Sequence, residues 1–335
     1  MIGILHKIFH EVNIVLYIKD HEVHVQKRRM SAVDPRTRLD MRPNILNIAV
    51  IDNIDTKDST FQYGNIYDAV RSTAHATLRM VFQFQRPDLV NLNNELLENQ
   101  CLFDIDISIK KYIKSASFVS TPNVVILQPG EAPSENKHVH HAVDMFLEDF
   151  GYTEDGTLNV VCDEAIYRRM KDYKNNEQTV HCILGQWRTN KAMCSALIAA
   201  FSGYGLFGLA KQLGIRFLDK LVQIADYRAT FKVLELIWIA VGTAIHLYID
   251  EKNISINDIS KENNNLLKVW YNFYQWAGYL KLHKIGIHMA NFDLQAYSLM
   301  AFAPLFPRTR KYRYAESVAQ FLSDLQNNPQ LLQDL

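Results

Sequence analysis

Two short apolar runs that each lead into acidic residues set the strongest constraint on the fold of this chain. The first covers residues 45–51 and leads into Asp52 and Asp55, and the second covers residues 158–162 and leads into Asp163. Runs of this length and composition are typical of strands buried inside a sheet. In open α/β sheets, ligands and metals collect at the carboxyl ends of such strands. The sequence therefore predicts an α/β sheet that carries carboxylates at one edge.

The remaining patterns divide the chain into three parts. Residues 1–44 mix short apolar stretches with a basic segment, and we interpret them as an N-terminal extension, the remnant of a preceding unit. Residues 45–190 alternate strand and helix patterns, whereas residues 191–335 carry apolar residues at helical three- and four-residue spacing. That helical pattern continues to Leu335 without a stop signal, so we expect a truncated helical region.

The composition is that of an ordinary globular protein. Of 335 residues, 48% are hydrophobic, and 36 basic and 36 acidic side chains give zero net charge. This balance argues against bulk DNA or RNA binding but leaves room for a local basic patch. The longest apolar stretch, residues 234–249, is interrupted by Glu235 and His246 and predicts a helix buried on nearly all sides rather than a membrane span. We therefore expect an intracellular protein, in the nucleus or cytoplasm, with no membrane partner.

The order of elements expected in residues 45–190 is three strands, a helix, a strand, a helix and a strand. This order resembles the ribonuclease H-like fold of many polynucleotidyl transferases, so we expect a mixed α/β sheet of that fold, followed by a mostly α-helical part. The resemblance implies an acid on the first strand, a second after the fourth strand and a third on a later helix. Asp52, or Asp55 as the alternative, matches the first place, Asp163 the second and Glu235 the third.

Three converging carboxylates would suit two-metal catalysis. Two divalent ions about 4 Å apart activate the attacking oxygen and stabilise the leaving one, and Mg²⁺ prefers carboxylate ligands. If the protein is catalytically active, we expect Asp52, Asp163 and Glu235 to bind Mg²⁺ and carry the reaction. Structural interpretations compete with this one. Asp52 lies in a turn-type sequence, Asp163 is placed to cap a helix that starts at Glu164, and Glu235 has basic neighbours on its own helix.

A short segment near the end of the chain interleaves basic and aromatic side chains. Its four cations are Arg308, Arg310, Lys311 and Arg313, and the tyrosines at 312 and 314 flank the last of them. Arginine and lysine suit phosphates and tyrosine suits stacking on bases, so we expect nucleic-acid binding here, with DNA as the partner. A charged loop between helices is the alternative. We expect core packing or a homo-oligomer interface at seven aromatic residues of the helical region, Trp238, Trp270, Tyr271, Phe273, Tyr274, Trp276 and Tyr279.

Several segments of the chain resemble a lineage-expanded family of uncharacterised fungal proteins. They are residues 52–55, 61–68, 72–79, 185–191, 226–230, 286–287 and 290–293. The family looks derived from mobile elements, and the resemblance, which spans most of the chain after residue 45, implies descent from a ribonuclease H-like, DDE-type transposase. The family has no established activity that can be carried over to this chain.

Three functions follow as hypotheses. The first is a transposase-like polynucleotidyl transferase or nuclease, degenerate or active. The second is a non-catalytic nucleic-acid-binding or protein-interaction module on the same fold. The third is an unrelated α/β enzyme with a small-molecule substrate, which predicts a deep, mostly apolar pocket away from the acids. The first two differ in whether Asp52, Asp163 and Glu235 converge.

Overall fold

A computed structural model describes residues 34–42, 45–58, 72–85, 122–151, 157–175, 180–216 and 218–328. The strands of these residues form one mixed sheet in the order β3-β2-β1-β4-β5. The chain also divides into two compact units, one holding β1, β2, β3 and α3 and the other holding β4, β5 and the helices from α4 to α12. The expected mixed sheet followed by a mostly helical part is confirmed. The domain boundaries at residues 44 and 190 stay predictions.

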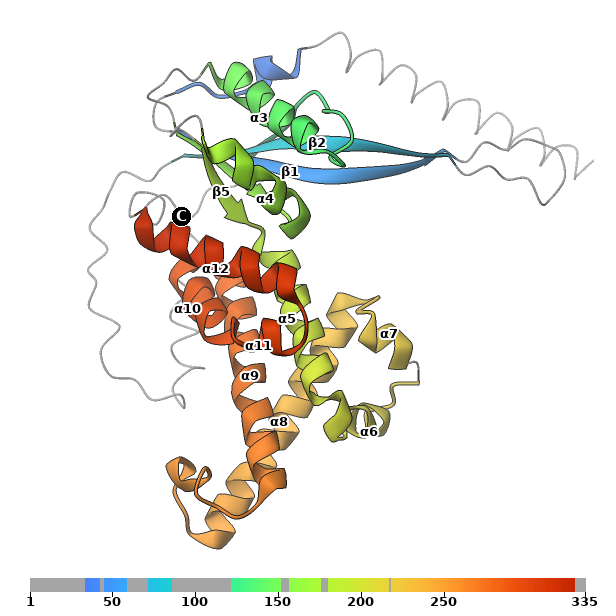
Figure 1. Cartoon of the computed structure of the whole chain (residues 1–335), viewed down its shortest axis with the longest axis vertical. Helices are drawn as coiled ribbons and strands as arrows, with labels where there is room; N and C mark the ends of the chain where they lie inside the picture. Colours follow the sequence, from blue (N-terminus) through green and yellow to red (C-terminus); the bar gives the residue numbers. More distant parts are fainter. Residues whose placement is uncertain are drawn as a thin grey trace, which may run out of the picture. The chain divides into compact units, whose positions relative to one another are not determined.

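The first unit is built on a long antiparallel strand pair. β1 (Ile45–Asp58) pairs along its length with β2 (Ser72–Gln85), and β2 pairs with the short β3 (Asn123–Ile126). The 3-10 helix η1 (Pro35–Arg38) precedes β1, and α3 (Asn136–Phe150) packs on β2 (Figure 1). Alternate residues of the strands point into the core beneath α3, where the side chains of Ala49, Ile51, Val81, Val139, Val143 and Phe146 are buried.

β1 is longer than predicted, which changes the place of Asp52. The strand continues through Asp58, and Asp52 lies opposite Leu78 in the middle of the β1–β2 ladder. The prediction that Asp52 stands at the carboxyl end of its strand is therefore wrong. Asp and Asn favour turns by bonding to their own backbone, but a full-length partner strand satisfies the same backbone groups and overrides that local preference.

The second unit begins with two parallel strands followed by helices. β4 (Leu158–Cys162) pairs with β5 (Val180–Leu184), α4 (Glu164–Met170) and η4 (Lys171–Asn175) follow β4, and α5 (Gln186–Phe201) follows β5. Gly185 follows the end of β5 and is the N-cap residue of α5. A Cβ at Gly185 would lie 3.0 Å from the Cys162 carbonyl oxygen, so a larger residue here would force the backbone to shift slightly away from β4.

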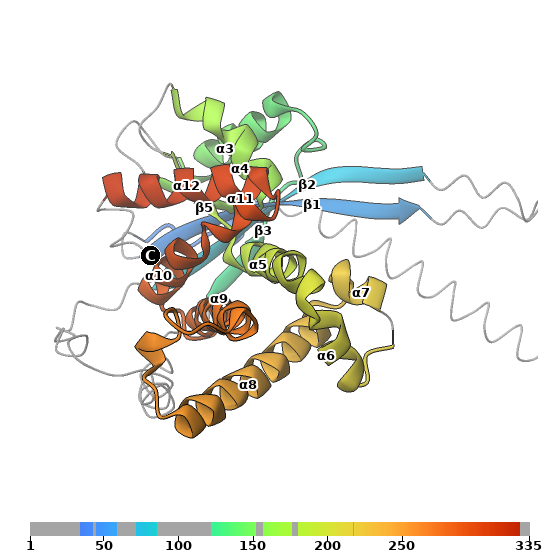
Figure 2. The ribbon, with the colours of Figure 1, turned by 60° about the horizontal axis from the view of Figure 1, so that its bottom comes forward.

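The rest of the second unit is helical. It comprises η5 (Ser202–Tyr204), α6 (Leu206–Gln212), α7 (Leu218–Val222), α8 (Tyr227–Lys252), η6 (Ile256–Asp258), α9 (Asn265–His288), α10 (Phe292–Phe302), α11 (Leu305–Arg308) and α12 (Tyr312–Asn327). Asp226, Asn264 and Asn291 cap the N-termini of α8, α9 and α10 with their side chains. Helix α9 is the centre of the packing, because it contacts α5, α8 and α10 (Figure 2).

Helix α8 is buried on one face only. Val233, Leu234 and Ile237 are buried, whereas Ile239 is 52% and Leu247 64% exposed. The prediction of a helix buried on nearly all sides is therefore wrong, since apolar composition does not say how many neighbours surround a helix. By length and composition alone α8 would be able to cross a membrane, and so would the bent pair Gln186–Tyr204 and Leu206–Gln212. Core helices of soluble proteins pass the same test.

Candidate nucleic-acid interface

Asp163 lies at the carboxyl end of β4, as predicted, and its carboxylate has two partners. Oδ1 accepts a hydrogen bond from the Ile166 backbone N–H at 2.9 Å, and Oδ2 accepts one from Arg188 Nη1 at 3.0 Å. Arg188 lies in the first turn of α5, which begins at the same edge because β4 and β5 are parallel. The alternative that Asp163 caps α4 is confirmed. Arg188 balances the negative charge of the capping carboxylate.

The neighbouring Tyr314 of α12 is held in its protonated form. Burial raises the pKa of its hydroxyl to about 12, and the negative charges of Glu164 and Asp163 act in the same direction. Glu164 is itself buried and accepts a hydrogen bond from the Ser317 hydroxyl at 3.4 Å. This edge of β4 is therefore held by internal bonds between α4, α5 and α12.

The other predicted acids have different surroundings. Glu235 of α8 forms an ion pair with Lys281 of α9 and not with a basic residue of its own helix. Asp52 accepts a hydrogen bond from the Asn53 backbone N–H at 2.8 Å. The side chain of Asp55 lies outside the described residues. Asp52 belongs to the first unit, and Asp163 and Glu235 to the second.

These surroundings do not offer a ready ligand set for Mg²⁺. In the second unit both predicted carboxylates are already bound to a cation, Arg188 in one case and Lys281 in the other. Within the part of the chain that the structure describes, no group of three or more His, Cys, Asp or Glu side chains is arranged to hold a metal ion. The convergence of the three acids and the Mg²⁺ site stay predictions.

The predicted basic segment lies at the junction of α11 and α12. Arg308 ends α11, Arg310 adopts a left-handed backbone with φ 60°, and Arg313 lies in the first turn of α12. Lys311 is half-buried, and burial lowers the pKa of its ammonium group. Among the described residues, no carboxylate forms an ion pair with any of these four cations. Their charges are therefore free to attract an anion from solution.

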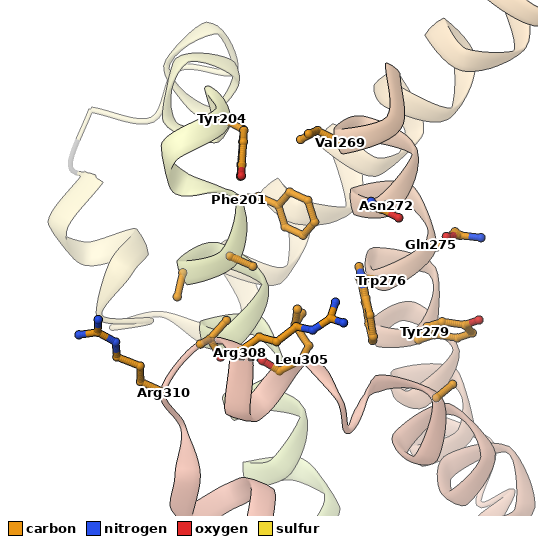
Figure 3. Close-up of a pocket in the computed structure, with 14 residues that line it drawn as sticks. Phe201, Tyr204, Val269, Asn272, Gln275, Trp276, Tyr279, Leu305, Arg308 and Arg310 are labelled. Carbon is orange, nitrogen blue, oxygen red and sulfur yellow. Dashed lines mark hydrogen bonds between the residues drawn. The ribbon is translucent and has the colours of Figure 1, made fainter. Parts of the chain in front are cut away.

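Two of the four cations line an open cavity of about 730 Å³ in the second unit (Figure 3). The end of α5 supplies Phe201, η5 supplies Tyr204, and α9 supplies Trp276 and Tyr279 with the amides of Asn272 and Gln275. In the figure the Arg308 side chain extends from α11 toward Trp276, whereas Arg310 points away from that ring. The wall thus combines cationic, amide and aromatic groups, which are the groups that contact phosphates and bases.

Packing against the core holds the aromatic wall in place. The Trp276 ring lies edge-on to Phe302, with ring centroids 5.7 Å apart, and Phe201 lies edge-on to Phe273 at 5.3 Å. Tyr204, by contrast, is 55% exposed at the rim of the cavity. A base entering the cavity would meet rings whose orientation is already fixed, which reduces the entropy lost on binding.

The arginines of the cavity could be predicted from the sequence, but its aromatic wall was missed. We assigned the aromatic residues of α9 to a core or interface. The buried Phe273 confirms the core part, Trp276 and Tyr279 also line the cavity, and the interface stays a prediction. The missed signal is the spacing of residues 269, 272, 276 and 279, which places Val269, Asn272, Trp276 and Tyr279 on one face of α9. Such a face, with a polar member, is less apolar than a core-facing stripe.

No protein-family model matches the chain, and no curated protein or solved structure matches it either.

Proposed function

We propose that this protein is a nucleic-acid-binding module that holds a single strand at the cavity beside α11. The observation that supports it is the combination of Arg308 and Arg310, two arginines without a carboxylate partner among the described residues, with Tyr204, Trp276 and Tyr279 around one cavity. Arginines bind phosphates, and aromatic rings stack on unpaired bases of any sequence. The volume of about 730 Å³ is within the range of natural ligand sites.

The single-stranded form is favoured over a duplex. Stacking on a protein ring requires a base whose face is free, and a base in a duplex has both faces covered by its neighbours. The small-molecule enzyme hypothesis predicts a deep, mostly apolar pocket, whereas this cavity is open and has arginine and amide groups in its wall. Since the net charge of the chain is zero, binding would depend on this local group of cations.

The affinity of the chain for a labelled single-stranded DNA of about 12 nucleotides, within the range that one binding fold covers, tests the proposal. We expect the double variant Arg308→Gln, Arg310→Gln to bind about tenfold or more weakly, because a hydrogen bond to a charged group contributes about 1.5–3 kcal/mol. Tyr204→Ala should weaken binding by about 1–3 kcal/mol through the loss of one stacked base. Fluorescence anisotropy measures both effects.

Arg216→Gln is the matched control for these variants. Arg216 is exposed, lies in the same unit and does not line the cavity. Its substitution makes the same Arg→Gln change at one position outside the cavity and should leave the affinity unchanged. An equal loss of affinity in this control and in the double variant would refute binding at the cavity.

Metal-dependent polynucleotidyl transfer is a second candidate function, on a ribonuclease H-like fold. The strand order β3-β2-β1-β4-β5 supports it, with β1, β2 and β3 antiparallel and β4 and β5 parallel. Under this proposal Mg²⁺ binds only the folded chain, so it raises the Tm. Asp163→Asn should abolish that rise while it keeps the helix cap, since Asn caps as well as Asp.

The control is Asp219→Asn, which removes an exposed carboxylate on α7 of the same unit. This variant should respond to Mg²⁺ as the unsubstituted chain does. If the purified protein shows neither a rise in Tm with Mg²⁺ nor cleavage of a DNA strand, polynucleotidyl transfer is excluded and nucleic-acid binding is the remaining proposal.

A further inference from the structure

A second cavity of the same unit lies at the other end of α5 and α9. It has a volume of about 910 Å³ and is bounded by the first turns of α5, the start of α8 and the last turns of α9. It shares no lining residue with the cavity beside Arg308. Three segments far apart in the sequence, residues 185–191, 226–230 and 286–287, contribute to its wall, although we singled them out only as marks of kinship.

The charge of this cavity is unbalanced. Lys191, Arg228, Lys232 and Lys284 line it, and none of them forms an ion pair with a carboxylate of the described residues. The two acids in the wall have other partners. Asp226 accepts the Ala229 backbone N–H at 3.0 Å as the cap of α8, and Glu235 is paired with Lys281. Four cations therefore face one open space without a carboxylate bound to any of them, an arrangement suited to a multiply charged anion.

An aromatic surface adjoins the four cations. Trp187 is 53% exposed and lies edge-on to Tyr227, with ring centroids 5.5 Å apart. The Lys284 ammonium lies 3.6 Å from the centroid of the Phe231 ring and 5.9 Å from that of Tyr227. An aromatic face, and not an acid, thus holds this lysine. Burial lowers the pKa of Lys284, and the positive charge of Arg228 adds to the effect.

A chain of polar groups behind the wall anchors Tyr227, one of the residues that line the cavity. The Tyr227 hydroxyl donates to Asn190 Oδ1 at 2.6 Å, and Asn190 Nδ2 lies 2.9 Å from His283 Nδ1. His283 Nε2 in turn lies 2.8 Å from Gln186 Oε1, and Gln186 Nε2 donates to the Leu184 carbonyl at 2.7 Å. This chain ties α5, α8 and α9 together, so the Tyr227 ring, against which Trp187 packs, is held in position before a ligand arrives.

We propose that this second cavity binds a phosphorylated nucleoside, with its phosphates against Lys191, Arg228, Lys232 and Lys284 and its base against Trp187. The ligand is either a free nucleotide or the 5′-phosphorylated end of a strand, since both present a phosphate beside a base. The inference does not depend on the function proposed for the cavity beside Arg308, because the two sites use different side chains.

Binding of ADP to the full chain in the presence of EDTA, followed by calorimetry, tests the proposal. We expect saturable binding below about 1 mM, and adenosine or pyrophosphate alone should bind at least about tenfold more weakly. The double variant Arg228→Gln, Lys232→Gln should lose about tenfold or more in ADP affinity, because each lost contact to phosphate is charge-assisted. Both side chains are exposed, so these substitutions leave the core intact.

The matched control is Lys252→Gln with Lys211→Gln, two exposed lysines that do not line the cavity. This control should bind ADP like the unsubstituted chain. The double variant Arg308→Gln, Arg310→Gln should do the same, because its substitutions lie in the other cavity. Binding of a 5′-phosphorylated oligonucleotide is compared with that of its 5′-hydroxyl form. If the phosphate strengthens binding, the ligand is a strand end; if it does not, the ligand is a free nucleotide. The proposal is overturned if neither ADP nor the phosphorylated strand binds, if pyrophosphate binds as well as ADP, or if the cavity variant and its control bind ADP equally.

Discussion

Asp149→Ala is expected to destabilise the first unit by about 3–5 kcal/mol, because it leaves a buried charge without its partner. The Arg79 side chain is fully buried on β2 and forms an ion pair with Asp149 of α3. Its Nη1 donates to the Gln128 carbonyl at 3.1 Å, and its guanidinium lies 4.2 Å from the centroid of the Phe146 ring. Burial lowers the pKa of Arg79, and the hydrogen bond to Asp149 opposes that shift. An arginine keeps its charge in proteins.

Hydrogen exchange of the α3 and β2 amides measures this loss, because all four tryptophans of the chain lie in the second unit and report only on that unit. Glu148→Ala removes an exposed charge from the same helix and should change the stability by less than about 0.5 kcal/mol. Adding Arg79→Met to Asp149→Ala should restore part of the stability, since the uncompensated charge is then gone. Unchanged exchange in Asp149→Ala would show that the ion pair does not hold α3 on the sheet.

Acidification from pH 6.5 to pH 4 is expected to destabilise the second unit by up to about 3 kcal/mol through His283 alone. Burial lowers the pKa of its imidazole from 6.5 to about 4. Between these values the unfolded chain binds a proton that the folded chain does not, so stability is complete above pH 6.5 and falls as the pH decreases toward 4. The hydrogen bonds of His283 also explain why the folded chain keeps the imidazole neutral. Asn190 Nδ2 only donates, so His283 Nδ1 must stay unprotonated to accept from it.

Urea unfolding followed by tryptophan fluorescence at pH 7 and pH 4.5 measures this dependence. The unsubstituted chain should lose stability between pH 7 and pH 4.5. In His283→Gln this loss should be smaller, by most of the contribution assigned to His283. His288→Gln removes an exposed imidazole from the same helix and should keep the full dependence. If both variants show the same pH dependence as the unsubstituted chain, the buried imidazole is not the group that titrates.

The parts of the fold that depend on neighbouring residues could be predicted from the sequence. The strand and helix order and the capping of α4 by Asp163 are of this kind, because an N-cap involves only residues within one turn. The length of β1 could not be predicted, since it depends on pairing with β2, which lies beyond a connecting segment. The preference of Asp and Asn side chains for turns led us to predict the end of a strand at Asp52.

The candidate sites depend on contacts between distant segments, so the sequence identified only some of their residues. Glu235 was recognised as an unusual acid, but its partner Lys281 lies on another helix. Arg308 and Arg310 were recognised from their local charge, but the rings that line the same cavity come from α5, η5 and α9. Short-range sequence patterns do not indicate which faces of these helices pack together.

The salt dependence of single-stranded DNA binding tests the central proposal most directly. Each phosphate contact to a single strand adds about 0.7 to the slope of log K against log salt, so Arg308→Gln, Arg310→Gln should lower that slope by about 1.4 between roughly 50 and 200 mM NaCl. Arg216→Gln should leave the slope unchanged. A slope that is the same in the double variant and in the unsubstituted chain would contradict phosphate contact at this cavity.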